Sequence, residues 1–392
     1  MDISEHQIWK GVSSFKKPLH LLRLDLARFY ARFYPRSIFV GVTGSVGKTS
    51  TVAASYAVLS KKYPCLVTKP NLDTVFNLPI TILKIKPNIK KVILEMGVEY
   101  PGEMEFYLQL VKPATAIVTN ISYQHSQFLG GLDSIRKEKG LLVKQLPKNG
   151  IAILNYNDPN VRELANNTSA RVIFYGQDRK NCHIWAGNYK IEQFKSSFEI
   201  NYGVERVEVN YDLLGEHQMY SALAATALGL SEGMNLISIK NALEKVTPPP
   251  HRLQPLPGYN GSIIIDDTYN SSPASVEEAL DTLQMLPASR RIFVFGGMRE
   301  LGEYSENLHR RIAQKVYKDR IDMVFLSQGE VDIVADELLS LGFLEERLGV
   351  NLTNPQIVAR LLKILSKGDI CLIKGARALK LDEVVERVIK KR

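Results

Sequence analysis

Cysteine is scarce in this sequence of 392 residues, which contains only Cys65, Cys182 and Cys371. The three are odd in number, far apart and outside any metal-ligand spacing, so neither a disulfide framework nor a zinc site is expected. We therefore predict that each of them is a small apolar filler.

Long apolar runs are also missing. No segment reaches the roughly 18 consecutive apolar residues that cross a bilayer, and residues 1–5 lack the basic start and apolar run of a signal peptide. With 45% hydrophobic and 23% charged residues, the composition is that of a soluble globular protein. These features predict a cytoplasmic protein of two or three domains.

The net charge of +9 favours anionic partners such as nucleotides and phosphates, and it would also suit nucleic acid or an anionic membrane. Nucleic acid is not a predicted partner, because the basic residues are dispersed and no aromatic-basic binding motif occurs. Residues 16–36 place Arg23, Arg28, Arg32 and Arg36 among leucines and aromatics at near-helical spacing. Such a helix can make a peripheral membrane contact, although it more often packs on a neighbouring domain.

Residues 41–50 read Gly-Val-Thr-Gly-Ser-Val-Gly-Lys-Thr-Ser and fit the phosphate-loop form Gly-x-Thr-Gly-x-x-Gly-Lys-Thr. A predicted strand at 37–40 precedes them and a predicted helix at 51–61 follows, which places backbone N–H groups around an anion. We expect Lys48 to reach the phosphates of ATP and Thr49 to ligate Mg²⁺. The alternative is an ordinary glycine turn with a surface lysine. The predicted phosphate-binding residues are Gly44, Ser45, Gly47, Lys48, Thr49 and Ser50.

From residue 38 to about 246, apolar runs alternate with helical stretches. Continuous apolar strands at 91–95, 114–119 and 150–155, each followed by a helix, predict a parallel sheet that is covered on both faces. Between about 170 and 212 the pattern alternates instead, which predicts a half-buried antiparallel appendage.

The clearest linker is Thr-Pro-Pro-Pro at 247–250, because three prolines fit neither a helix nor a central strand. Beyond it, apolar strands at 262–266, 291–295, 323–327 and 369–374 predict a second, smaller, Rossmann-like α/β domain. The predicted domains are a basic amphipathic segment at 1–36, a central parallel-sheet ATPase domain with the phosphate loop at 37–247, and a C-terminal α/β domain at 248–392.

Two polar residues follow predicted strands at the edge where open α/β sheets bind ligands. Glu95 closes one strand and can hold Mg²⁺ opposite Thr49. The alternative for Glu95 is a solvated strand-end carboxylate. His125 follows the next strand, and its alternative is a hydrogen-bonding loop residue.

Further polar and glycine-rich segments follow in a fixed order: Asn77-Leu78-Pro79-Ile80-Thr81, Glu95-Met96-Gly97, Thr119-Asn120-Ile121 with His125, Lys139-Gly140, Asp266-Asp267-Thr268-Tyr269-Asn270, Gly296-Gly297-Met298-Arg299-Glu300 and Lys374-Gly375-Ala376-Arg377. Together with the phosphate loop they resemble the Mur ligase family from about residue 38 to the end. The later segments look most like its D-alanyl-D-alanine-adding branch.

The resemblance implies ATP-dependent amide bond formation. A carboxylate on a carrier substrate would be activated as an acyl phosphate, and the amine of an amino acid or dipeptide would then displace phosphate. The family's catalytic and metal-binding positions fall on Lys48, Thr49, Glu95, His125 and Lys139. In the family the lysine at the position of Lys139 carries a carbamate that serves as an extra metal-binding carboxylate. Lys137 and Lys144 are alternatives.

The resemblance also implies nucleotide contacts on both sides of the linker. Arg252 matches the arginine that reaches the ATP phosphates, and Asp267 matches the carboxylate that binds the ribose. Gln218 stands where the family has an asparagine near the adenine, so its contact is uncertain from the motif. The implied liners of the amine-substrate side are Tyr269, Asn270, His309, Lys374 and Arg377, and the alternative for each is a purely structural role.

The sequence departs from the family at its start, where only about 37 residues precede the phosphate-loop strand. That is too short for the family's N-terminal UDP-sugar-binding domain, so we expect either a different carrier or a carrier held by another surface or protein. The predicted function is a cell-wall (peptidoglycan) peptide ligase. The alternatives are a ligase for polyglutamate, a cyanophycin-like polymer or a tetrapyrrole, and a phosphate-loop ATPase without ligase activity.

Overall fold

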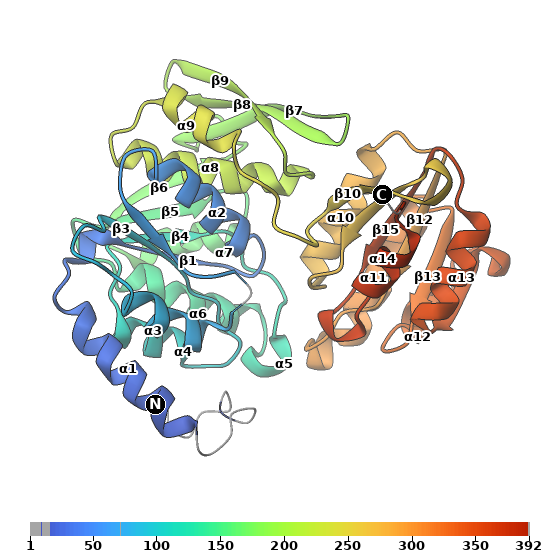
Figure 1. The fold of residues 1–392 in the computed structure, drawn as a ribbon, viewed down its shortest axis with the longest axis horizontal. Coiled ribbons are helices and arrows are strands. Elements are labelled where there is room, and N and C mark those ends of the chain that lie inside the picture. The colour runs from blue at the N-terminus through green and yellow to red at the C-terminus, as the bar shows by residue number, and fades with distance from the viewer. Residues whose placement is uncertain (1–8, 10–15, 71, 391–392) are drawn as a thin grey trace.

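The computed structural model describes Trp9, residues 16–70 and residues 72–390. Two sheets, one on each side of the proline run at 247–250, form its frame (Figure 1). In this described part of the chain, no helix is long and apolar enough to cross a membrane. Of the predicted N-terminal segment, only Trp9 and residues 16–36 lie within the described residues.

The first sheet has the strand order β2-β3-β1-β4-β5-β6-β7-β8-β9. Neighbours from β2 to β7 pair in parallel, whereas β7, β8 and β9 pair antiparallel. The predicted parallel sheet and antiparallel appendage are therefore confirmed, but the appendage begins at β7 and extends the same sheet. The strands are β1 (Phe39–Thr43), β2 (Cys65–Val67), β3 (Lys91–Glu95), β4 (Thr115–Val118), β5 (Ile151–Asn155), β6 (Arg171–Gly176), β7 (Ile184–Glu192), β8 (Lys195–Tyr202) and β9 (Glu205–Tyr211).

Helices cover both faces of this sheet, as the apolar strands require. Val40 and Ile93 pack with the face covered by α2, α8 and α9, and Val92 and Leu94 with the face covered by α3, α4 and α6. The helices are α1 (Lys17–Ala31), α2 (Lys48–Leu59), α3 (Thr74–Ile82), α4 (Glu103–Leu110), α5 (Ser126–Leu129), α6 (Leu132–Lys144), α7 (Pro159–Arg162), α8 (Glu216–Ser231) and α9 (Leu236–Leu243).

Two predicted boundaries next to the phosphate loop are wrong. The strand expected at 37–40 is β1, which runs to Thr43 because its second half pairs with β3 and β4. The helix expected at 51–61 begins at Lys48, directly after Gly47. The loop between strand and helix is therefore only four residues long, from Gly44 to Gly47.

The second sheet has the order β10-β11-β15-β12-β13-β14, with β10 antiparallel and the rest parallel. The four predicted strands are confirmed within a residue. Two strands were not predicted: β10, an edge strand with two prolines, and β14, an edge strand with two buried and two exposed residues among its five. The elements are β10 (Gln254–Pro257), β11 (Ile263–Asp267), β12 (Arg290–Phe295), β13 (Met323–Ser327), β14 (Leu348–Leu352), β15 (Asp369–Lys374), α10 (Pro273–Met285), α11 (Ser305–Lys318), α12 (Asp332–Ser340), α13 (Asn354–Ile364) and α14 (Asp382–Val388).

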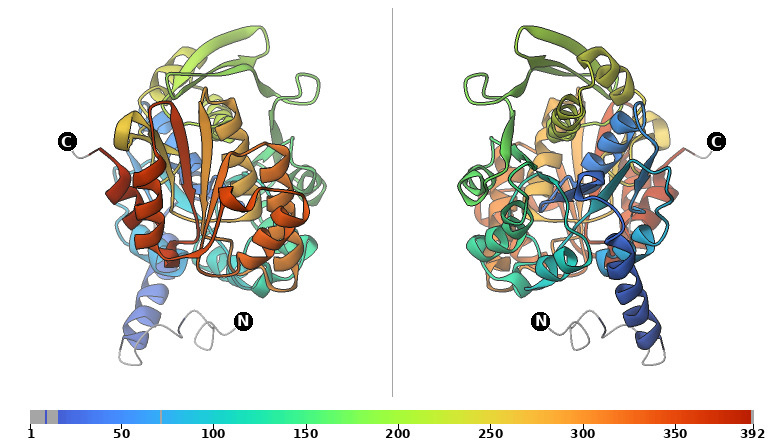
Figure 2. Two further views of the ribbon diagram at one scale, coloured as in Figure 1. Left: turned by 90° about the vertical axis from the view of Figure 1, so that its right-hand side faces the viewer. Right: turned by 90° about the vertical axis from the view of Figure 1, so that its left-hand side faces the viewer.

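The two parts touch through α5 and the short 3-10 helix η6 (Gly302–Tyr304). Ser126 Oγ donates to the Leu301 carbonyl at 3.1 Å, and the Gln127 N–H donates to the Glu300 carbonyl at 2.9 Å. The rings of Tyr123 and Tyr304 lie 4.8 Å apart. In the left view of Figure 2 the C-terminal sheet and its helices lie in front of the central part, and in the right view they lie behind it.

Candidate active site

The phosphate loop lies between the end of β1 and the start of α2. Gly44 has a φ of +148° and Gly47 a φ of +80°, values that favour glycine. A Cβ at Gly44 would lie 1.9 Å from Thr119 Oγ1, so a larger residue would displace the end of β4. Gly47 directly precedes α2, whose first N–H groups have no partner within the helix. The loop therefore has the geometry of an anion site.

Residues that follow β4 hold this loop in place. The N–H of Val46 donates to Asn120 Oδ1 at 2.6 Å, and the N–H of Ser45 donates to the Asn120 carbonyl at 2.8 Å. Thr119 Oγ1 donates to the Val46 carbonyl at 2.6 Å, and the Ser122 N–H donates to Ser45 Oγ at 3.0 Å. Thr119 and Asn120 belong to a segment that carries the family resemblance, but their role in holding the loop was not predicted.

Lys48 and Thr49 open α2 beside Glu95, the last residue of β3. Lys48 Nζ donates to the carbonyls of Gly44 and Ser45 at 2.9 and 3.0 Å, and burial lowers the pKa of Lys48. Thr49 Oγ1 lies 3.2 and 3.1 Å from the two carboxylate oxygens of Glu95. A hydroxyl and a carboxylate are oxygen donors of the kind that Mg²⁺ takes, so this pair fits the predicted metal.

Within the described residues, no group of three or more His, Cys, Asp or Glu side chains is arranged to hold a metal ion. A magnesium ion held by Thr49 and Glu95 would complete its coordination with oxygens of water and of the phosphates of a bound nucleotide. This is the usual way in which nucleotide-binding sites hold Mg²⁺.

Lys139 lies in α6 and is 1% exposed. Burial lowers the pKa of Lys139 well below its usual value, and the charge of Lys48 acts in the same direction. Glu103 accepts the N–H groups of Glu99 and Tyr100 at 2.6 and 3.1 Å, while burial raises its pKa to about 7. Burial therefore favours the uncharged amine of Lys139 and the protonated carboxyl of Glu103.

His125 stands at the start of α5 with a φ of 55°. Its Nδ1 contacts the carboxylate of Glu300 from the C-terminal part, and its Nε2 lies 4.0 Å from Glu99 Oε1. The hydrogen bond from His125 lowers the pKa of Glu300. The predicted histidine is thus at the junction of the two parts and engaged by carboxylates.

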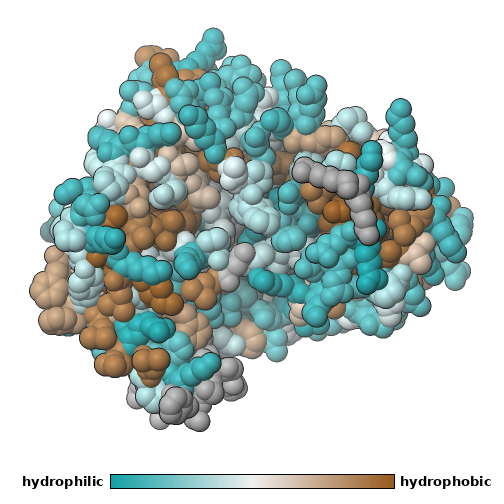
Figure 3. Space-filling view, viewed as in Figure 1, coloured by the Kyte–Doolittle hydropathy of each residue, from teal (hydrophilic) through white to brown (hydrophobic). Residues whose placement is uncertain are grey.

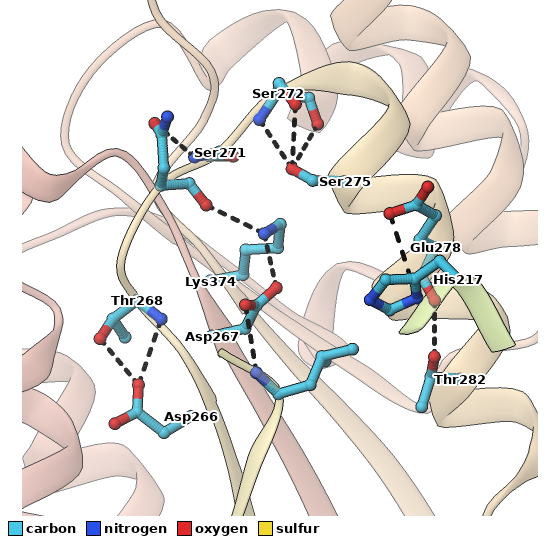
Figure 4. A network of polar contacts seen from close by, with 12 residues as sticks. His217, Asp266, Asp267, Thr268, Ser271, Ser272, Ser275, Glu278, Thr282 and Lys374 are labelled. Carbon is cyan, nitrogen blue, oxygen red and sulfur yellow. Dashed lines mark hydrogen bonds and ion pairs between the residues drawn. The ribbon is translucent and has the colours of Figure 1, made fainter. Parts of the chain in front are cut away.

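Asp267 and Lys374 form a buried ion pair at the ends of β11 and β15 (Figure 4). Lys374 Nζ lies 2.5 Å from Asp267 Oδ2 and donates to the Asn270 carbonyl at 2.9 Å. Asp267 Oδ1 accepts the N–H of Leu253 at 3.2 Å. The predicted ribose carboxylate is therefore already neutralised by a lysine of its own sheet.

His217, Gln218 and Glu278 come from α8 and α10 and lie beside this ion pair (Figure 4 shows His217 and Glu278). His217 Nδ1 lies 4.0 Å from Glu278 Oε2, and its Nε2 lies 3.1 Å from Gln218 Nε2. Burial lowers the pKa of His217 to about 4 and raises the pKa of Glu278 to about 8. Both titratable groups are thus mostly neutral at pH 7. The sequence analysis missed Glu278, which belongs to no motif.

Arg252 stacks on Tyr269, with the guanidinium carbon 4.2 Å from the ring centroid, and Arg377 lies 5.6 Å from the same centroid. Such cation–π contacts fix the direction of a long side chain. His309, by contrast, is buried in α11 and accepts the Met298 N–H at 3.1 Å. The prediction that His309 lines the substrate side is therefore wrong, because its ring is buried and hydrogen-bonded inside the C-terminal part.

One cavity of about 320 Å³ joins the two parts. Lys139 and Gly44 lie outside its lining. Gln124, which the sequence analysis missed, borders it with a buried Oε1 that has no hydrogen-bond partner among the described residues. The predicted residues that line the cavity are Ser45, Gly47, Lys48, Thr49, Ser50, Glu95, His125, Gln218, Arg252, Asp267, Tyr269, Asn270 and Lys374.

Family models match both parts of the chain. The "Mur ligase middle domain" matches residues 42–229, and the "Mur ligase, glutamate ligase domain" matches residues 251–377. The UDP-N-acetylmuramoyl-tripeptide–D-alanyl-D-alanine ligase of Escherichia coli is 29% identical over 92% of this chain and 78% of its own length. The ligase of the same name from Buchnera aphidicola is 30% identical over 90% of this chain and 75% of its own length.

Solved structures share the fold. MurF from Acinetobacter baumannii has a TM-score of 0.86 at 22% identity and covers 95% of this chain and 81% of its own. MurF from Thermotoga maritima, solved in complex with ADP, has a TM-score of 0.83 at 23% identity and covers 94% of this chain and 83% of its own. At these identities the likeness establishes the arrangement of the central and C-terminal parts.

Proposed function

The chain belongs to the Mur ligase family and is an ATP-dependent acid–amino acid ligase, and on that premise we propose that it joins a muramyl tripeptide carboxylate to the amine of D-alanyl-D-alanine. The observation that carries this proposal is a cavity lined both by the phosphate loop and by Arg252, Asp267 and Lys374 of the C-terminal part. This supports a site in which residues of both parts act on the same bound ATP.

In the proposed reaction, a carboxylate oxygen of the carrier attacks the γ-phosphorus of ATP, and ADP leaves. The amine then attacks the acyl carbon, and inorganic phosphate leaves as the amide forms. Phosphoryl transfer needs alignment and charge neutralisation more than covalent help from the protein. The N–H groups of the loop and the Lys48 ammonium would provide both. When Mg²⁺ is bound, it supplies further positive charge, and Thr49 and Glu95 would hold it with His125 nearby.

We propose that Lys139 carries a carbamate, as the family resemblance implies. Its lowered pKa supports this, since only an uncharged amine can attack CO₂. A Lys139→Ala variant should lose ligase activity, and small carboxylic acids should restore part of it. Lys137→Ala and Lys144→Ala on exposed positions of the same helix are the controls and should stay active. Lost activity that no carboxylic acid restores would count against the carbamate.

Arg252, Asp267 and Gln218 are the proposed nucleotide contacts from the second half of the site. Their support is that all three border the same cavity as the phosphate loop. Both oxygens of Asp267 accept a hydrogen bond already, but each carboxylate oxygen can accept a second one from a ribose hydroxyl. An Asp267→Asn variant should therefore raise the KM for ATP more than it lowers kcat.

The experiment that tests the proposal is a phosphate-release screen in which candidate acids are crossed with candidate amines. Release should require both a UDP-muramyl tripeptide and D-alanyl-D-alanine, and Lys48→Ala should lower its rate by about 10²–10³. If no UDP-muramyl peptide caused phosphate release, the proposed cell-wall substrate would be wrong. Release with polyglutamate, cyanophycin-like or tetrapyrrole acids would assign the chain to those alternatives. Release without any acid would favour an ATPase.

A further inference from the structure

Helix α1 packs one face on the central part of the molecule. Leu24, Ala27 and Ala31 are buried in the same core cluster as α3 and α4. The hydroxyls of Tyr30 and Tyr34 donate to the Ile85 carbonyl at 2.8 and 3.2 Å. These contacts confirm that the helix packs on its neighbour, and they fix which of its faces points outward.

The outward face is apolar. Leu19, Leu22, Leu26, Phe29 and Phe33 are each between 50% and 67% exposed. The spacing of Leu19, Leu22, Leu26 and Phe29 places them within about 80° of one another around a helix that turns about 100° per residue. Phe33 lies in the turn after α1, and its ring is 5.2 Å from that of Phe29. Figure 2 shows α1 projecting from the body of the molecule, and Figure 3 shows apolar surface at the corner where Figure 1 places α1.

Basic side chains flank this apolar row on both sides. By the same helical geometry, Lys16 and Arg23 lie on one flank. On the other flank Asp25 lies next to the row, Arg32 lies beyond it, and Arg28 lies farther round, toward the buried face. Asp25 is the single acidic residue of α1. Arg36 is not part of the face, because its guanidinium donates to three backbone carbonyls of the central part.

We propose that this outward face of α1, defined by Leu19, Leu22, Leu26, Phe29 and Phe33, docks on an anionic membrane surface. Apolar side chains would enter the boundary between head groups and acyl chains, and the flanking lysine and arginine side chains would meet lipid phosphates. A second copy of the chain fits less well, since two such helices would bring like charges together. The inference goes beyond the ligase reaction and does not depend on it.

Helix α3 would separate the docked α1 from the active site. It contacts α3 along its length, from the His20 and Phe76 rings, 4.9 Å apart, to the tyrosine hydroxyls at Ile85. The residues at the start of α3, Asp73 and Thr74, border the cavity. Docking would therefore hold the central part at a membrane without covering α2 or the phosphate loop on the opposite face of the sheet.

The test is co-sedimentation of the full chain with vesicles of phosphatidylcholine, with and without phosphatidylglycerol. We expect binding only with phosphatidylglycerol, weakened by salt. Arg28→Gln with Arg32→Gln should lower the partition coefficient by about thirtyfold, at roughly 1 kcal/mol for each basic residue near an anionic surface. Leu26→Ser with Phe29→Ser should lower it by at least about tenfold through lost apolar burial.

The matched control is Leu339→Ser with Leu344→Ser, two similarly exposed leucines of the C-terminal part, which should bind as the unchanged chain does. Phosphate release in the absence of vesicles should be the same for all variants, so failure of docking and failure of the ligase reaction are separate results. No binding to phosphatidylglycerol vesicles, or equal binding to phosphatidylcholine alone, would overturn the proposal. So would a dimer in solution that Leu26→Ser with Phe29→Ser abolishes, because it would assign the face to a second copy.

Discussion

The phosphate-loop part of the cavity lining is one contiguous stretch, Ser45 to Ser50, whereas the opposite end is assembled from β11, β15, α8 and α10. At the phosphate end, backbone groups and the side chain of Asn120 hold the loop. At the opposite end, the structure depends on a charge pair, Asp267 with Lys374, and on the neutral His217 and Glu278.

Because of this difference, substitutions at the two ends of the cavity should affect different properties, folding stability at one end and catalytic rate at the other. A loop held by main-chain hydrogen bonds can lose a functional side chain and keep its shape. An end built on compensated charges cannot lose one partner without leaving the other buried and unpaired. We therefore expect substitutions at the C-terminal end to cost mainly folding free energy, and those at the phosphate end to cost mainly rate.

The largest expected effect is that of Lys374→Ala on stability. The side chains of Lys374 and Asp267 are only 2% and 10% exposed, so the substitution leaves a buried carboxylate without its counter-charge. The free energy of unfolding should fall by about 3–5 kcal/mol, measured by denaturant titration. As the control, Lys380→Ala removes an exposed lysine that follows β15 in the chain, and it should change the free energy of unfolding by less than about 0.5 kcal/mol. An unchanged midpoint in Lys374→Ala would show that the pair is not structural.

Lys48→Ala should have the second largest effect, on rate and not on stability. Loss of one charged group that stabilises the transferring phosphoryl costs about 10²–10³ in kcat, or about 2.7–4 kcal/mol. Because the Lys48 ammonium is buried and its pKa lowered, its removal should leave the unfolding free energy nearly unchanged. Phosphate release and denaturant titration measure the two quantities. Lys61→Ala, just beyond the end of α2, is the control and should leave both unchanged. A large loss of stability in Lys48→Ala would remove the contrast between the two ends.

The phosphate end could be predicted from sequence because its signals are local. The glycines, Lys48 and Thr49 are adjacent, and the apolar strand before Glu95 fixes where that carboxylate emerges. The parallel order of both sheets followed from apolar runs alternating with helices. The proline run also lay where one sheet ends and the other begins.

The opposite end could not be predicted in the same detail, since it depends on segments far apart in the chain. Lys374 and Asp267 are 107 positions apart, and His125 meets Glu300 across 175. The periodicity of apolar residues along the sequence gives no information about such long-range contacts. Glu278 resembles an ordinary helix residue in the sequence, and only the packing of α10 beside α8 places it in the site. The sequence of β14, Leu-Gly-Val-Asn-Leu, is interrupted by glycine and asparagine and does not form a continuous apolar run.

Asn120→Ala should have a smaller effect, and it tests whether the phosphate loop is held as firmly as its hydrogen bonds indicate. The substitution removes the acceptor of the Val46 N–H and should lower the free energy of unfolding by about 1–3 kcal/mol. The KM for ATP should also rise, because the loop loses its fixed shape. Asn120→Asp keeps an oxygen at this position and should retain more of the stability than Asn120→Ala does. Equal losses in both variants would indicate that the amide nitrogen matters more than the oxygen.

The smallest effect is a pH dependence from Glu278 at the opposite end. Burial raises the pKa of Glu278 to about 8 from an ordinary 4.5, although the side chain keeps 28% of its surface exposed. The folded protein therefore binds more protons than the unfolded chain between these values, so this residue lowers stability as pH rises toward 8.

Between pH 7 and 8 the fall from Glu278 should be about 1 kcal/mol. The pKa of Glu103 is raised to about 7, so Glu103 changes the free energy of unfolding mainly below pH 7. The pKa of His217 is lowered to about 4, so His217 changes it mainly between that value and its ordinary 6.5. Lys48 and Lys139 change stability in the opposite direction, since their lowered pKa values make the folded state bind fewer protons. The measured quantity is therefore the difference in unfolding free energy between the unchanged chain and Glu278→Gln, which should decrease from pH 7 to pH 8. A difference that stays constant would mean that Glu278 is already ionised, and the C-terminal end would then depend on charge compensation alone.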